Sequence, residues 1–181
     1  MKAIISLVPL GSVPTDLLPW LAERLSVVFN RPVIVDEPIP LPAAGYERHR
    51  RQYRGDVILA ALKAVASPAV ERVLGVIDAD CYAPGLNFIF GQATLEGRTA
   101  FIALPRLRPF FYGLAEDPPL FRQRVLIEAV HELGHTWGLI HCPDPHCVMH
   151  FSNTLHDTDV KGAAFCQRCQ DRWQKRSQAR R

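Results

Sequence analysis

The sequence lacks the features that mark membrane and secreted proteins. No apolar run approaches the roughly 18 residues that a membrane-spanning helix needs. The apolar opening, residues 1–10, is too short for a signal peptide, and no small-residue cleavage site follows it. Internal repeats are also absent, and 48% of the 181 residues are hydrophobic. We therefore predict one globular domain with a sizeable core, located in the cytoplasm and without a membrane partner.

Outside the C-terminal end of the chain, acidic and basic residues nearly balance, so there is little excess of either charge. The formal net charge is +3, yet residues 168–181 alone carry six basic side chains against the single acid Asp171, a net of +5 that leaves −2 for the rest. A basic end of this kind is typical of a solvated terminal helix or a frayed end. An arm that binds nucleic acid is the alternative, but we do not expect nucleic acid as a partner.

Cysteine is scarce too, and four of the five residues fall within the last 40 positions. Clustered thiols without a secretion signal indicate metal binding rather than disulfides. Four residues separate Cys142 from Cys147, and two separate Cys166 from Cys169. Such pairs predict a closed four-thiolate site for a structural zinc; a redox pair or an iron–sulfur cluster is the alternative. For the fifth cysteine, Cys81, we expect a buried free thiol.

Hydrophobic periodicity predicts that strands and helices alternate along the chain. We expect strands over residues 2–8, 32–35, 72–78, 87–90 and 99–104, and helices over residues 14–30, 55–65 and 118–137. Between residues 46 and 54 the chain is polar and basic, and we expect it to be exposed. This order favours an α/β fold in which a twisted mixed sheet packs against the last helix. We divide the domain into a sheet-and-helix part over residues 1–141, a C-terminal zinc-stabilised part over 142–170, and a basic tail over 171–181.

The last expected helix carries a group of residues suited to metal chemistry. His131 and His135 are four residues apart, so their rings share one helix face and can bind one metal. Glu132 lies beside the first histidine, where its carboxylate can reach a metal-bound water. Gly138 suits the turn that ends the helix, and His141 follows with a third imidazole. Three protein ligands and a water form the open site of a catalytic zinc, so we predict hydrolysis with Glu132 as the general base.

Other residues near this motif have less specific roles. Met149 is expected to form an adaptable apolar floor beneath the metal. Glu128, one helical turn before the first histidine, could orient a ligand ring or could be a solvated or salt-bridged carboxylate. The remaining histidines of this region are expected at the surface or behind the metal ligands, at positions His146, His150 and His156.

The run from His131 to Met149, followed by Cys166 and Cys169, resembles the archaemetzincins, a branch of the metzincin-type metallopeptidases. The resemblance extends over about residues 73–169 and includes segments 74–78, 83–93, 151–153 and 157–159. One departure is that 16 residues separate Met149 from Cys166, where the family pattern has about 17.

The resemblance implies a single metzincin-like domain with two zinc ions per chain. It implies a catalytic zinc on His131, His135 and His141, a general base at Glu132 and a Met-turn at Met149. It also implies a structural zinc on the four clustered cysteines, Cys142, Cys147, Cys166 and Cys169. The implied activity is cleavage of peptide bonds in peptide or protein substrates.

Two interpretations of function follow. The first is a zinc-dependent peptidase, in which a peptide adds to a sheet edge beside the cleft; we expect that edge at residues 99–104, with residues 87–90 as the alternative. The second is a zinc-stabilised binding module, for which the basic tail offers nucleic-acid binding as one form. An intact Glu132 favours the peptidase, because a binding module needs no base at that position.

Overall fold

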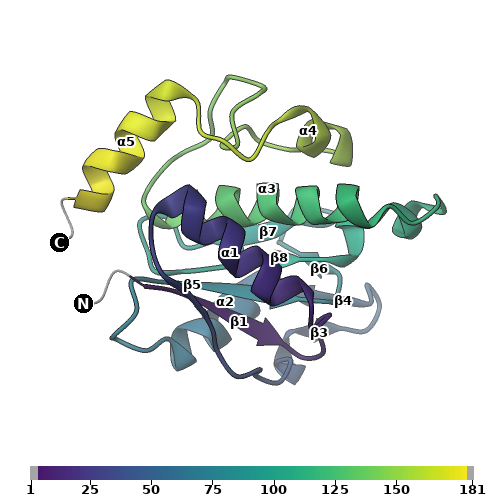
Figure 1. The fold of residues 1–181 in the computed structure, drawn as a ribbon. Helices are drawn as coiled ribbons and strands as arrows, with labels where there is room; N and C mark the ends of the chain where they lie inside the picture. The colour runs from purple at the N-terminus through teal and green to yellow at the C-terminus, as the bar shows by residue number, and fades with distance from the viewer. Residues whose placement is uncertain (1–3, 179–181) are drawn as a thin grey trace.

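The computed structural model describes residues 4–178, and a five-stranded mixed sheet forms its centre (Figure 1). Four neighbouring strands run parallel and the fifth is antiparallel to its neighbour. In spatial order they are β2 (Val33–Val35), β1 (Ile5–Leu10), β5 (Arg72–Ile77), β8 (Thr99–Ala103) and β7 (Gly91–Ala93). The twisted mixed sheet expected from the sequence is therefore confirmed. Of the first expected strand, residues 2 and 3 lie outside the described part of the chain.

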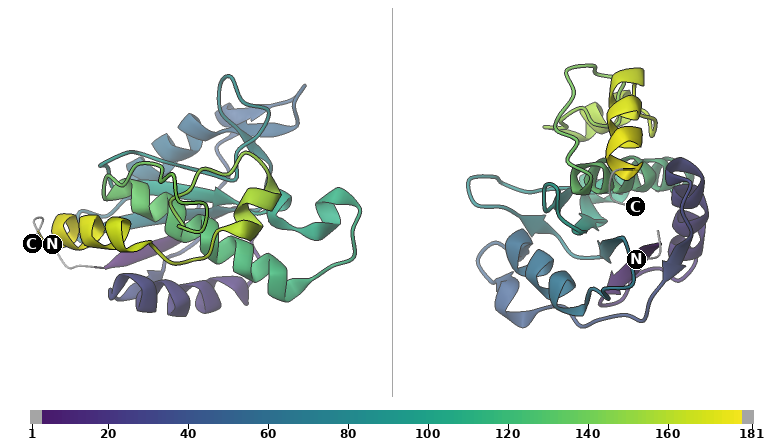
Figure 2. Two further views of the ribbon diagram at one scale, coloured as in Figure 1. Left: turned by 90° about the horizontal axis from the view of Figure 1, so that it is seen from above. Right: turned by 90° about the vertical axis from the view of Figure 1, so that its left-hand side faces the viewer.

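Helices cover both faces of the sheet, as Figures 1 and 2 show. Helices α1 (Leu17–Phe29) and α3 (Pro118–Thr136) pack on one face, and α2 (Gly55–Val65) packs on the other. Successive side chains of β5 alternate between the two cores: Leu74 belongs to the first and Val73 to the second. The central parallel strands β1, β5 and β8 are buried along their whole length, which explains why they are almost continuously apolar.

The expectation that residues 99–104 form an edge strand is wrong. Strand β8 lies between β5 and β7, and all five of its residues are buried. Residues 87–90 do not form the edge either, because their only pairing is an isolated bridge from Ile89 to Cys81. The edge strand next to β8 is β7. Its sequence Gly-Gln-Ala has none of the β-branched or aromatic residues that indicate a strand.

Helix boundaries differ little from those expected. Helix α2 has the bounds that the sequence indicates, and α3 ends one residue early. Helix α1 begins at Leu17 rather than Pro14, so Pro19 falls in its first turn. A proline is tolerated there because the first N–H groups of a helix have no acceptor within it. Among residues 4–178, none of the helices combines the length and the apolar character that a membrane crossing requires.

A second, three-stranded sheet was not predicted. It consists of β3 (Tyr46–Glu47), β4 (Gln52–Arg54) and β6 (Cys81–Tyr82). Residues 46–54 are thus only partly exposed, since Gln52 is buried and its side-chain amide donates a hydrogen bond of 3.0 Å to Asp80. Strands of two or three residues are too short to give a periodic signal in the sequence.

The C-terminal segment forms a further layer over α3, on the side away from the sheet (Figures 1 and 2). It contains the short helix α4 (Leu155–Val160) and the longer helix α5 (Gln167–Gln178). Helix α5 crosses the boundary expected at residue 170, so residues 171–178 continue a folded helix rather than forming a separate tail. Residues 179–181 lie outside the described chain.

Aromatic side chains join α5 to the two helices beneath it. Trp173 lies with its ring centroid 5.7 Å from that of Phe29 at the end of α1 and 6.1 Å from that of Trp137 at the end of α3. Phe29 and Trp137 stack on each other at 4.9 Å, and Phe165 stacks on Trp173 at 6.2 Å. Such contacts add to the apolar area that the rings bury, so α5 contributes to the core.

Replacing Trp173 with alanine therefore tests whether α5 is part of the fold. Because the side chain is only 6% exposed, we expect Trp173→Ala to lower the free energy of unfolding in urea by about 3–5 kcal/mol. The matched control, Lys175→Ala, removes an exposed side chain from the same helix and should change it by no more than about 0.5 kcal/mol. Equal stability of the two variants would show that α5 is only a solvated end.

Candidate metal centre and substrate cleft

Three histidine rings converge at the C-terminal end of α3. The Nε2 atoms of His131 and His135 are 3.1 Å apart, and the ring of His141 lies 5.5 Å and 4.9 Å from the other two, centroid to centroid. One ligand atom from each ring lies within 4.8 Å of the others. A tetrahedral zinc with bonds of ~2.0–2.1 Å places two nitrogens ~3.3 Å apart, so this set fits one metal ion.

Backbone carbonyls fix the orientation of the two helical histidines. Nδ1 of His131 donates a 2.7 Å hydrogen bond to the carbonyl of Val148, and Nδ1 of His135 donates one of the same length to the carbonyl of Leu139. A carbonyl only accepts, so each Nδ1 carries the proton and each Nε2 keeps its lone pair. Partners of this kind select the ring nitrogen that binds a metal.

Burial keeps these rings neutral. It lowers the pKa of His131 well below 6.5, and the nearby ammonium of Lys161 adds to the effect. Burial likewise lowers the pKa of His135 to about 4 and, less strongly, lowers the pKa of the more exposed His141. Neutral imidazoles offer lone pairs without first losing a proton, which suits metal binding at neutral pH.

Glu132 is buried between the histidines and the edge strand β7. A Cβ built on Gly91 of β7 would lie 2.7 Å from Cγ of Glu132 and 2.9 Å from its Oε1, so only glycine leaves room for this carboxylate. Burial raises the pKa of Glu132 well above 4.5, the carboxylate of Glu128 raises it further, and Lys161 opposes both. A carboxyl group with a raised pKa can both accept and return a proton near neutral pH.

Met149 packs directly against α3 beneath the histidines. It is fully buried, and a Cβ on Gly134 would lie 2.5 Å from its sulfur atom. The carbonyl of Met149 accepts a 2.9 Å hydrogen bond from the N–H of Cys142. The turn that contains Met149 therefore supports both the helix and the segment that carries the third histidine.

Four cysteines form a second candidate metal site. The sulfur atoms of Cys142 and Cys166 are 3.8 Å apart, and those of Cys147 and Cys169 lie within 4.8 Å of them and of each other. Zinc–sulfur bonds of ~2.3 Å in a tetrahedron place two sulfurs ~3.8 Å apart. Within residues 4–178 no cysteine forms a disulfide, and Cys81 is buried as a free thiol. The cluster thus fits one tetrahedral ion.

Nitrogen donors face the sulfur atoms of this cluster. The guanidinium of Arg168 donates to Cys142 at 3.2 Å, and the N–H of Cys166 donates to Cys147 at 3.3 Å. Burial acts to raise the pKa of Cys142, but the N–H of Asp144, Arg168 and the neighbouring thiols outweigh it, and the pKa falls to about 7. A thiol that ionises near neutral pH is suited to bind a metal as thiolate, whereas burial raises the pKa of Cys147 and of Cys169.

A cleft extends to both sides of the histidine site. One hollow of about 230 Å³ lies toward the start of α3 and is lined by Glu128, Phe88 and the segment 151–153. The other, of about 450 Å³, lies along β7 and is lined by Leu95 and by Ile140, among others. His131 and Glu132 line both hollows, so a chain that lies in the cleft passes the candidate metal site.

The edge strand β7 presents free backbone groups to this cleft. The N–H of Thr94 bonds to the carbonyl of Thr99, and the N–H of Ala103 bonds to the carbonyl of Phe90. Hydrogen-bonded pairs alternate along an antiparallel ladder. Residues 90, 92 and 94 therefore face β8, whereas the N–H and C=O groups of residues 91 and 93 point away from it, along the wall of the larger hollow.

The remaining candidate residues of this region are exposed or half-buried, with one exception. His146 and His156 are exposed, and His150 is half-buried with its Nδ1 bonded to the carbonyl of Cys142 at 2.8 Å. Glu128 is the exception: it is 3% exposed and forms an ion pair of 3.1 Å with Lys161. The salt-bridged alternative for Glu128 is thus the observed one, but the pair is buried.

Sequence reasoning missed Gly91 and Lys161. A glycine next to an apolar run, Phe88 to Phe90, is a signal for close approach of another group to the backbone, and it could have indicated Gly91. Lysine is almost never fully buried, and nothing in the sequence distinguishes Lys161 from a surface residue.

Comparisons with known proteins agree on one family. The model of peptidase family M54 matches residues 44–175. An archaemetzincin from Pyrococcus furiosus is 42% identical over 175 residues, which cover 93% of this chain and 91% of that protein. The crystal structure of archaemetzincin from Methanopyrus kandleri matches with a TM-score of 0.87 and 38% identity, covering 98% of this chain and 96% of the other. The structure from Archaeoglobus fulgidus matches at 0.81 and 38%, covering 93% and 99%.

The contact between Gly91 and Glu132 generates a prediction about stability. In Gly91→Ala the new methyl group meets the Phe101 carbonyl at 2.6 Å and the Glu132 side chain, so we expect a loss of about 1–3 kcal/mol from overpacking. The control is Gly162→Ala, whose methyl group would have no neighbour closer than 3.9 Å. Urea denaturation of both variants measures the difference, and equal midpoints would contradict the packing described for Glu132.

Proposed function

Because the chain belongs to peptidase family M54, the archaemetzincin zinc metallopeptidases, we propose that Glu132 is the general base of peptide-bond hydrolysis at a zinc held by His131, His135 and His141. The observation that carries the proposal is the position of Glu132. Its carboxylate is buried next to the three converging rings and against the backbone of β7. A base there lies between the metal ligands and the strand along which a peptide can bind.

The donor set suits zinc. Three neutral imidazoles, those of His131 and His135 with Nε2 turned inward, leave a fourth position open, which is the arrangement of catalytic rather than structural zinc sites. When bound, zinc polarises the scissile carbonyl and makes water acidic enough to lose a proton near neutral pH. The rest of the reaction falls to residues of the chain.

Glu132 moves the proton. Its carboxylate takes a proton from the attacking water, whose oxygen forms a bond to the carbonyl carbon of the substrate. The same group then gives that proton to the leaving nitrogen as the carbon–nitrogen bond breaks, so Glu132 ends the cycle as it began. The apolar surroundings that raise its pKa make the protonated form accessible between these two steps.

Substrate binds along β7 in this proposal. The backbone groups of Gly91 and Ala93 that face the cleft add an extended peptide to the sheet as one more antiparallel or parallel strand. Side chains of the peptide then enter the hollows on either side of His131. This assignment replaces the edge expected at residues 99–104.

The four cysteines hold a second, structural zinc. They leave no coordination position open, and their segment joins the Met-turn to α5. Because Cys142 directly follows His141 in the chain, the structural ion fixes the backbone beside the third catalytic ligand. Two zinc ions per chain follow from this assignment. The alternative function, a zinc-stabilised binding module, requires the same metals but no base at residue 132.

Replacing Glu132 separates the two functions. Glu132→Gln keeps the size of the side chain but removes the base, so we expect it to retain its zinc while hydrolysis of a cleavable peptide falls by at least ~10²-fold. His135→Ala instead removes a ligand, and we expect it to lose zinc as well as activity. Zinc content and the rate of peptide cleavage are measured on both variants. Cleavage by Glu132→Gln at the wild-type rate would rule out the mechanism.

Metal analysis tests the count and the roles of the ions. We expect two zinc ions per wild-type chain and one in the variant Cys166→Ser/Cys169→Ser, which should also unfold at a lower temperature because metal binding at a structural site is coupled to folding. A chelator should remove the histidine-bound ion first, since that site has only three protein ligands. If the cysteine-bound ion leaves first, the two roles are assigned wrongly.

A further inference from the structure

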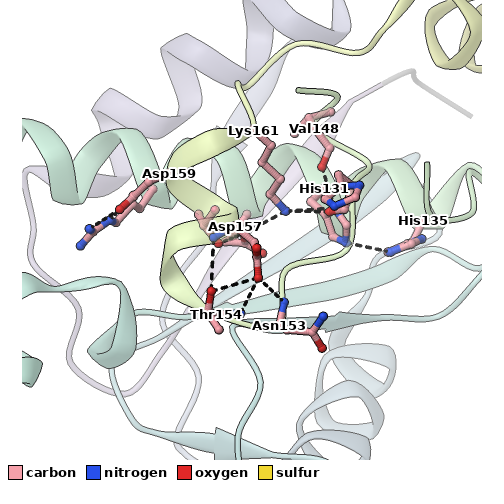
Figure 3. Close-up of polar contacts among 12 residues, drawn as sticks. His131, His135, Val148, Asn153, Thr154, Asp157, Asp159 and Lys161 are labelled. Atoms are coloured by element: carbon pink, nitrogen blue, oxygen red, sulfur yellow. Dashed lines mark hydrogen bonds and ion pairs between the residues drawn. The ribbon is translucent and has the colours of Figure 1, made fainter. Parts of the chain in front are cut away.

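Lys161 is a buried cation that the proposed reaction does not use. Its side chain is fully buried, and its Nζ lies 3.1 Å from Oε1 of Glu128, which is also buried. The same carboxylate oxygen accepts a 3.0 Å hydrogen bond from the hydroxyl of Thr158. Figure 3 shows the lysine side chain extending from its own segment toward α3 and ending beside His131.

The ammonium group contacts two parts of the candidate catalytic site. Its Nζ lies 3.4 Å from Nδ1 of His131 (Figure 3). It also donates a 3.2 Å hydrogen bond to the carbonyl of His150. Nδ1 of His131 donates its own hydrogen bond to the carbonyl of Val148, so the ammonium lies against the ring edge rather than donating to it. The carbonyls of Val148 and His150 flank Met149. Lys161 thus bridges a metal-ligand ring and the Met-turn.

Holding α4 onto α3 does not require this lysine. Arg124 of α3 and Asp159 of α4 already form a two-pronged ion pair, with distances of 2.6 and 2.7 Å. The start of α4 is fixed separately by the capping box of Thr154 and Asp157, drawn in Figure 3. Two ion pairs therefore hold this segment to α3, one from α4 itself and one from Lys161 directly after it, but only the one with Lys161 reaches a metal-ligand candidate.

The stability of the folded state does not by itself explain a buried ion pair between Glu128 and Lys161. Removing two charges from water costs several kcal/mol each, and apolar residues of similar volume often stabilise a core as well or better. The contacts that set this pair apart are those of Nζ with the ring of His131 and with the carbonyl of His150. Partners behind a metal-binding histidine fix its orientation and its affinity for the ion.

We propose that Lys161, anchored by Glu128, is a positioning residue of the histidine zinc site. Its ammonium holds the ring of His131 and the Met-turn in one arrangement, so that Nε2 of His131 points at the metal position before the ion binds. The proposal rests on the proposed function only for the identity of the metal; it concerns affinity for zinc and makes no claim about cleavage.

The test removes both charges at once, so that no buried charge is left unpaired. The variant Glu128→Gln/Lys161→Met is compared with the matched control Arg124→Met/Asp159→Asn, which removes the other ion pair between α3 and α4. Zinc affinity of the histidine site is measured by competition with a chelator, with the cysteine site loaded. We expect affinity to fall by about 10–100-fold in the first variant and to be unchanged in the control.

Two further readouts separate positioning from general damage. The visible absorption spectrum of cobalt(II) in the histidine site should change in Glu128→Gln/Lys161→Met and remain that of wild type in the control. Thermal unfolding of protein without the histidine-bound ion should be similar for both variants. Wild-type zinc affinity and a wild-type cobalt spectrum in the first variant would overturn the proposal, whatever either protein does to a peptide.

A second variant covers the case in which the protein with Glu128→Gln/Lys161→Met does not fold. Glu128→Gln/Lys161→Gln keeps a hydrogen-bond donor at residue 161, but the amide is one bond shorter and does not reach the ring of His131. We expect the same loss of zinc affinity. If neither variant folds while the Arg124 and Asp159 control does, Lys161 serves folding rather than the metal site, and the proposal is wrong.

Discussion

The peptide link between His141 and Cys142 ties together two candidate ligand groups that come from different parts of the fold. His141 completes a set whose other members belong to α3, whereas Cys142 belongs to a cluster completed beside α5. Since a peptide unit is planar and only two torsions per residue are soft, fixing Cys142 leaves His141 little freedom. The N–H of Cys142 also bonds to the carbonyl of Met149. The third histidine is therefore placed by the C-terminal layer and not by the helix that carries the first two.

The same layer orients the histidines of α3. The carbonyl of Val148 accepts a hydrogen bond from Nδ1 of His131, and the carbonyl of Leu139 accepts one from Nδ1 of His135. Neither carbonyl belongs to α3. The helix therefore supplies the two rings, and hydrogen bonds to the chain beyond it determine which ring nitrogen faces the metal position. The aromatic cluster of Phe29, Trp137 and Trp173 holds this chain against the helices. Core packing and the candidate chemistry thus depend on one another.

The parts of the fold that the sequence predicts are those with a repeating signal. The spacing of four between His131 and His135 has meaning only on a helix, and the apolar face of residues 118–137 supplies that helix. Cysteine spacing likewise indicates a cluster without any knowledge of the backbone. Strand β7 escaped prediction because three residues, two of them Gly and Ala, carry no periodic pattern. Lys161 escaped because its position is set by contacts with Glu128 and His131, residues at least 30 positions earlier in the chain.

The shortness of β7 limits what can bind beside it. An exposed sheet edge invites pairing with any other chain, and proteins commonly blunt such edges by keeping them short. Here only residues 91–93 form the edge, and Glu132 lies against Gly91 at one end of it. A folded domain cannot pair one of its own strands with an edge of three residues unless that strand first detaches from its own sheet. If peptide binds along β7 as we propose, the cleft admits flexible termini, exposed loops and already unfolded chains, and well-packed proteins resist cleavage through their own stability.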